Sequence, residues 1–158
     1  MRLLAALALV LLVPAPLLAQ QPGTSRFKGQ WTNPRGHVYA ADFTLEIKPD
    51  GAAQGAITWT LVKSPRENEQ AKLGRTGVEH VRGRYDAGCR VLTLEGWRKD
   101  DPDSILGLDT YRLVLSDNGQ ALVGPTRSHG SWEGRFDATR ADAAPRPAGP
   151  GRRDKEHE

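Results

Sequence analysis

Alternation of apolar and polar residues is the clearest pattern along the chain. In residues 42–48, the side chains of Phe43, Leu45 and Ile47 share one side of an extended chain, and charged or hydroxyl-bearing residues occupy the other. Alternation with a period of two predicts a half-buried β-strand. The Pro-Asp-Gly sequence at 49–51 then predicts a turn.

Similar segments continue along the chain and predict about eight strands. In order, they are residues 27–33, 42–48, 56–62, 77–85, 89–97, 108–115, 121–127 and 131–139. The polar stretch 63–77 indicates a loop with room for a short helical turn. About eight strands suffice to close a sheet on itself, which removes its exposed edges. We therefore expect an all-β fold, a small antiparallel up-and-down β-barrel.

A recurring pair of residues supports closure of the sheet. Glycine stands two residues before an aromatic residue at Gly29/Trp31, Gly83/Tyr85, Gly130/Trp132 and Gly134/Phe136. Residues two apart share a face of a strand, so the glycine allows a bend and the ring fills the space beside it. Tightly curved strands of this kind favour a barrel over a flat sandwich.

The two ends of the chain differ from this β region. Residues 1–19 combine an early arginine, an apolar run broken by proline and a final small residue, which is typical of a secretory signal peptide cut after Ala19. We expect residues 20–25 to form a short linker and residues 26–140 the barrel domain. Residues 141–158 lack apolar periodicity and are rich in proline, glycine and charge, which predicts a disordered tail. The protein is therefore expected to be secreted or periplasmic, without stable membrane insertion after signal cleavage.

Charge and motif content narrow the function classes. The chain has 22 Lys and Arg against 19 Asp and Glu, a balance that argues against nucleic-acid binding. A single cysteine, Cys89, forms no internal disulfide and is either buried, free or paired with another chain. No zinc motif, P-loop or nucleophile elbow occurs. We expect no cofactor, no metal and no enzyme; a hydrolase assembled around His80 or His129 is the weakest alternative.

Several residues of the predicted barrel are candidates for ligand binding. Asp109 lies in phase with Tyr111, and a carboxylate on an inner face is costly unless it is paired or near a rim. A polar hook for a ligand at the barrel mouth is one interpretation, and a solvated strand end is the other. The aromatic candidates, which fit either a pocket or a plain core, are Trp59, Tyr85, Trp97, Tyr111 and Trp132.

The segment FKGQWTNPRG, residues 27–36, resembles the opening strand of the avidins and streptavidins. Their G-x-W-x-N-x-x-G pattern starts an eight-stranded barrel that binds biotin, and the resemblance implies that Asn33 hydrogen-bonds the ureido oxygen. His37 stands where avidins have a serine, and Ile57 follows Gly55 where they have a hydrogen-bonding residue. The resemblance therefore implies a calycin-like barrel without the full biotin site.

The same G-x-W resembles the start of the lipocalins, which are also calycin barrels. That resemblance implies a structural plug in which Trp31, after Gly29, lies at the closed end beneath Arg135 or Arg140. We expect an exported non-enzymatic protein that binds a small apolar or amphipathic ligand in its barrel. The alternative is a protein-interaction module, or an inhibitor of an extracellular enzyme, that acts through loop 63–77.

Overall fold

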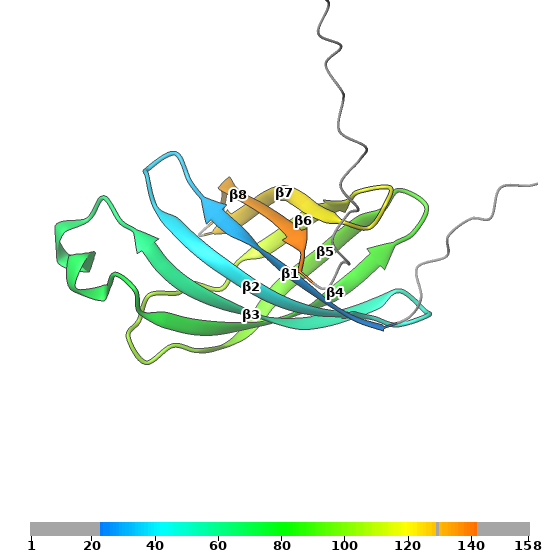
Figure 1. Ribbon diagram of the computed structural model, residues 1–158, viewed down its shortest axis with the longest axis horizontal. Coiled ribbons are helices and arrows are strands. Elements are labelled where there is room, and N and C mark those ends of the chain that lie inside the picture. Colours follow the sequence, from blue (N-terminus) through cyan, green and yellow to red (C-terminus); the bar gives the residue numbers. More distant parts are fainter. Residues whose placement is uncertain (1–22, 129, 142–158) are drawn as a thin grey trace, which may run out of the picture.

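The computed structural model describes residues 23–128 and 130–141, which form a closed antiparallel β-barrel (Figure 1). Each strand pairs with the next, and β8 returns to pair with β1. The strands are β1 (Gly23–Thr32), β2 (Val38–Ile47), β3 (Ala52–Lys63), β4 (Thr76–Asp86), β5 (Val91–Asp100), β6 (Thr110–Leu115), β7 (Ala121–Ser128) and β8 (Ser131–Arg140). A short 3₁₀ helix, η1 (Glu67–Lys72), lies between β3 and β4. The predicted eight-stranded barrel is confirmed.

The barrel begins earlier than the sequence pattern indicated. Strand β1 starts at Gly23, which pairs with Ile47 of β2, so part of the predicted linker 20–25 belongs to the sheet. Backbone pairing needs no apolar alternation, which explains why the pattern did not mark these residues. The predicted signal peptide, and the predicted tail except for residue 141, lie outside the described residues. Within the described part of the chain, no helix is long and apolar enough to cross a membrane.

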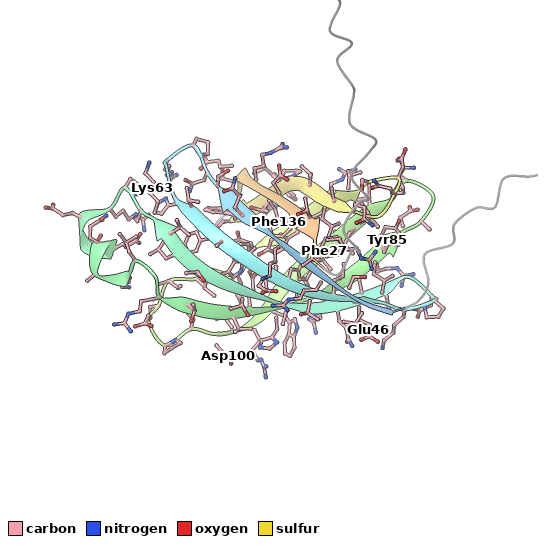
Figure 2. The ribbon with its side chains drawn as sticks, in the orientation of Figure 1. Phe27, Glu46, Lys63, Tyr85, Asp100 and Phe136 are labelled. Carbon is pink, nitrogen blue, oxygen red and sulfur yellow. The ribbon has the colours of Figure 1, made fainter. Side chains whose placement is uncertain are left out.

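The inner side chains fill the middle of the barrel. Phe136 is fully buried and meets the rings of Phe43, Trp59 and Tyr111 edge-on, with centroid separations of 6.2, 5.9 and 6.3 Å. Edge-to-face contacts at these distances are favourable. Figure 2 shows Phe136 in the interior, with Lys63 towards one end of the barrel and Tyr85 towards the other. The predicted inner face of residues 42–48 is also seen, since Phe43 and Leu45 are buried.

The up-and-down topology gathers alternate connections at the same end of the barrel. The β1–β2, β3–β4 and β5–β6 connections lie at the end where η1 projects (Figure 1). We call this end the mouth. Because the aromatic layer around Phe136 fills the barrel below it, the mouth is the end at which an open interior can exist.

A β-bulge changes the phase of β5 near the mouth. Val81 of β4 pairs with Gly96, but the preceding His80 pairs with Arg98, so Trp97 is an extra residue. A bulge shifts which side chains face inward beyond it. Without the bulge, alternation through Gly96 would make Arg98 an inward-facing residue. In the observed register Lys99 takes that place, because it stands opposite Glu79 on β4.

Replacement of Phe136 by alanine tests the importance of the aromatic layer. Loss of a fully buried ring leaves a cavity, so we expect Phe136→Ala to lower the free energy of unfolding by about 3–5 kcal/mol. The exposed Val114 is the control, because truncation of a surface side chain changes stability by only about 0.5 kcal/mol. Urea unfolding of both variants provides the measurement. Equal stabilities would show that the layer does not hold the barrel together.

Candidate functional site

A cavity of about 490 Å³ opens at the mouth of the barrel. Its volume falls in the range of about 300–1,000 Å³ that is usual for small-molecule sites. Four aromatic side chains line its walls: Trp31, Tyr39, Trp59 and Tyr111. Charged and polar residues from the connections surround the opening. Aromatic walls below a polar rim form the candidate site.

Glu79 provides a buried carboxylate in the cavity wall. It lies on the inner face of β4, and only 2% of its surface is exposed. The indole Nε1 of Trp59 donates to its Oε2 over 3.0 Å, and the hydroxyl of Tyr111 donates to the same oxygen over 2.5 Å. The backbone N–H of Asp109 donates to Oε1 over 2.9 Å. Glu79 therefore connects β3, β4 and the start of β6.

Gly96 of β5 provides the space that this carboxylate occupies. A Cβ at position 96 would lie 2.0 Å from the Oε1 of Glu79, closer than any real contact. The backbone N–H of Gly96 also donates to the carbonyl of Asp109 over 2.8 Å. A glycine at this point lets the neighbouring strand approach the buried acid.

Burial raises the pKa of Glu79 to about 7 from its ordinary value of 4.5. Desolvation is the largest cause, because burial penalises the charged form. The hydrogen bonds from Tyr111, the Asp109 backbone and Trp59 oppose this rise, while the negative charge of Asp109 adds to it. Burial, followed by the charge of Glu79, raises the pKa of Tyr111 well above 10. The acid can therefore change protonation near neutral pH.

Hydrogen bonds and ring contacts hold the other aromatic walls in place. The Nε1 of Trp31 donates to the Oγ1 of Thr126 over 2.6 Å, and the Tyr39 hydroxyl donates to the carbonyl of Ile105 over 2.8 Å. Tyr39 meets Trp31 and Trp59 edge-on, at centroid separations of 5.7 and 6.3 Å. Burial, followed by the charge of Glu69, raises the pKa of Tyr39 to about 12. These contacts hold the rings in defined positions in the folded protein.

At the rim, a small network joins the β1–β2 connection to the loop that carries η1. The Oδ1 of Asn33 accepts from the backbone N–H of His37 over 3.0 Å, and the Nε2 of His37 lies 3.4 Å from the Oε2 of Glu69. Burial alone would raise the pKa of Glu69, but hydrogen bonds from Ser64 and Arg66 bring it below its ordinary value. The predicted loop 63–77 therefore forms one wall of the mouth.

The predicted ligand-binding residues divide between the cavity and other places. Asn33, Trp59, Asp109 and Tyr111 all line the cavity. Tyr85 is half-buried and packs on the core towards the opposite end of the barrel (Figure 2).

Two predicted tryptophans lie outside this group. Trp97, the extra residue of the bulge, is exposed on the outer wall between Arg82 and Arg98, 5.6 and 5.4 Å from their guanidinium carbons. Trp132 is also exposed and does not line the cavity; the β7–β8 pairing is irregular beside it.

The structure places the residues of the predicted barrel plug differently. Trp31 lines the open cavity. Its indole packs directly against Gly134, since a Cβ added to that glycine would lie only 2.4 Å from the indole Nε1. Arg140 lies over Phe27, 5.8 Å from the ring centroid, rather than over Trp31. Arg135 is exposed and pairs with Asp137 at 3.6 Å. Gly29 allows close strand approach, since its Cβ would lie 2.0 Å from the carbonyl oxygen of Asp137.

Other chemically distinctive residues lie away from the cavity. His80 is on the outer wall, where its Nε2 lies 2.7 Å from the Oδ2 of Asp100. Cys89 is exposed at the β4–β5 turn and forms no disulfide. Among residues 23–128 and 130–141, no group of three or more His, Cys, Asp or Glu residues is arranged to hold a metal ion.

Sequence reasoning missed Glu79, although a signal for it was present. Glu79 stands two residues before Val81 and therefore on the inner face of the same predicted strand. Extending that alternation by one step would have identified a second inner carboxylate beside Asp109. Trp31 and Lys99 were missed as lining residues for another reason, because barrel depth and the bulge decide their positions.

The raised pKa of Glu79 predicts a pH-dependent stability. The folded chain holds the proton with a pKa of about 7, whereas 4.5 is the ordinary value. The contribution of Glu79 to the free energy of unfolding is therefore complete below about pH 4.5 and is lost as pH rises through about 7. The free energy of unfolding should fall by about 3 kcal/mol over this range. Glu79→Gln stays neutral and should lack this decline. Urea unfolding of both proteins between about pH 5 and pH 8 measures the difference; parallel declines would contradict it.

The fold places the chain among closed eight-stranded antiparallel barrels, which is consistent with a calycin-like barrel. No protein-family model matches the chain, and neither the curated proteins nor the solved structures searched contain a match. The avidin and lipocalin resemblances of residues 27–36 therefore stay predictions at the level of family.

Proposed function

We propose that this protein is a non-enzymatic binding protein that holds a small apolar or amphipathic ligand inside its barrel. The observation that carries the proposal is the open cavity of about 490 Å³ with four aromatic walls at the mouth. Large preformed pockets with apolar walls and a few convergent polar groups are the usual form of small-molecule sites. Export of the protein remains a prediction from the signal-peptide pattern of residues 1–19.

The rigidity of the cavity supports this proposal. Each polar ring atom of the four aromatic walls is already bonded within the protein: Trp31 to Thr126, Tyr39 to Ile105, and both Trp59 and Tyr111 to Glu79. Side chains that are ordered on folding lose little further freedom when a ligand binds. The ordering cost is therefore met in the free protein, which favours binding of a small molecule.

The arrangement does not favour biotin. The amide of Asn33 is occupied by His37, whose backbone N–H and ring Nδ1 it approaches at 3.0 and 3.4 Å. Ile57 is fully buried in the core and offers no hydrogen bond to a ureido group. The proposal therefore keeps the barrel and its ligand cavity but not the avidin ligand.

Loop 63–77 contributes side chains to the mouth of the cavity. Its Ser64 is buried and donates to Glu69, and both Arg66 and Glu69 line the cavity mouth. A loop whose side chains form a wall of the mouth favours control of ligand entry. The inhibitor alternative has less support from this geometry.

Binding of a neutral fluorescent probe tests the proposal. We expect N-phenyl-1-naphthylamine to bind with increased fluorescence, because the apolar walls remove it from water. Ile105→Trp should weaken binding at least about tenfold, since it adds bulk to a half-buried lining residue of the mouth. Leu108→Trp is the matched control, because Leu108 belongs to the same connection but is exposed and does not line the cavity. Equal binding by both variants, or no binding by the native protein, would contradict the proposal.

A further inference from the structure

We infer that the cavity is built for an organic cation, a small amine or quaternary ammonium compound whose positive group lies between the aromatic walls and the Glu79 carboxylate. This inference rests on the proposed ligand-binding function and names its ligand class. It follows from the partners of Glu79, from the distribution of charge around the cavity and from the chemistry of the walls.

Glu79 has hydrogen bonds but no cationic partner among the described residues. Its donors are an indole N–H, a phenol O–H and a backbone N–H, all of which are uncharged. Lys99 stands opposite Glu79 in the β4–β5 register, but its Nζ lies 3.3 Å from Asp101 and also donates to the carbonyl of Leu106. A ligand cation in the cavity would give this desolvated carboxylate a direct positive partner.

The basic residues at the mouth are already paired with acids. Arg35 lies 3.5 Å from Glu133, and Arg66 lies 3.0 Å from Glu69. With His37 left aside, the described residues that line the cavity include more acids than bases. The acids are Glu69, Glu79, Asp109 and Glu133, and the bases are Arg35, Arg66 and Lys99. The rim therefore does not favour an anion, and an anionic ligand would meet Glu79 in a poorly solvated site at a cost.

The aromatic walls complete the arrangement. The faces of Trp and Tyr rings attract cations within about 6 Å of their centroids, and the attraction is stronger where water is excluded. Four such residues surround the cavity: Trp31, Tyr39, Trp59 and Tyr111. A neutral ligand would gain only apolar contact here, whereas a cation would gain both ring attraction and the charge of Glu79.

The protonation state of Glu79 gives this interaction a pH dependence. Its pKa of about 7 means that the carboxylate is charged above neutral pH and neutral below it. The ionisable groups that face it are Tyr111 and Asp109 at the start of β6 and Lys99 of β5, and the packed residue of β3 is the uncharged Trp59. Tyr111 stays protonated, since its pKa is raised well above 10. Binding of a cation should therefore strengthen as pH rises from about 6 to about 8.

Three probes of similar shape separate charge from apolar contact: 2-phenylethylamine, 2-phenylethanol and phenylacetate. In calorimetric titrations of the native protein at about pH 8, we expect the amine to bind at least about tenfold more tightly than the alcohol, and phenylacetate to bind most weakly. At about pH 6 the advantage of the amine should fall several-fold, because Glu79 takes up a proton.

Two matched variants assign the effect to Glu79. Glu79→Gln should remove the preference for the amine, so that the amine and 2-phenylethanol bind this variant about equally. Glu95→Gln makes the same charge change on the outer wall, where Glu95 pairs with Arg82, and should keep the preference. A cooperative urea unfolding transition shows that each variant is folded, and the pH series on the native protein tests the inference without any substitution.

The outcomes distinguish this inference from the proposed function. If the three probes bind equally, or if Glu79→Gln keeps the preference for the amine, the cavity binds small molecules but the cation assignment is wrong. If N-phenyl-1-naphthylamine binds and the amine does not, the cation assignment is also wrong. If neither the neutral dye nor any of the three probes binds, both the inference and the proposed function fail.

Discussion

The organisation of the mouth depends on one desolvated carboxylate. Glu79 accepts three hydrogen bonds from Trp59, Tyr111 and the Asp109 backbone, and it thereby connects β3, β4 and the beginning of β6. A buried acid is tolerated only when its lone pairs are satisfied, so the donors and the acid fix one another. Two cavity walls are thus oriented by the group that also gives the cavity its charge. The proposed contact with a ligand therefore uses a group that the fold itself needs.

The aromatic layer below Glu79 decides how deep the cavity is. Phe136 occupies the barrel interior and meets Phe43, Trp59 and Tyr111 edge-on, so the half of the barrel beyond the mouth is filled by core. An eight-stranded barrel has room for either packed side chains or one small ligand. In this barrel the lower part is packed and the upper part is open.

The candidate site was only partly predictable from the sequence. Period-two alternation marked Trp59 and Tyr111 as inner residues, and Asp109 was expected near a rim; all three line the cavity. Alternation also marked Tyr85, but it does not reveal how far along the barrel axis an inner residue lies. Trp97 is out of phase with the buried Leu92 and Leu94, so alternation along β5 already placed it on the outer face. The bulge at Trp97 changes the phase only beyond it: Lys99, rather than Arg98, stands opposite Glu79, and pairing with β4 creates this bulge.

The sequence by itself determined the all-β class, the number of strands and most of their inner faces, because alternation and turn chemistry act over a few neighbouring residues. The tertiary structure alone decided the cavity and its chemistry. Strand register places Gly96 against Glu79. Because Gly96 has no side chain, the carboxylate of Glu79 has space to lie there. Burial among residues far apart in the chain then raised the pKa of that acid to about 7. Desolvation is a property of the assembled barrel, so no local pattern of residues could have specified it.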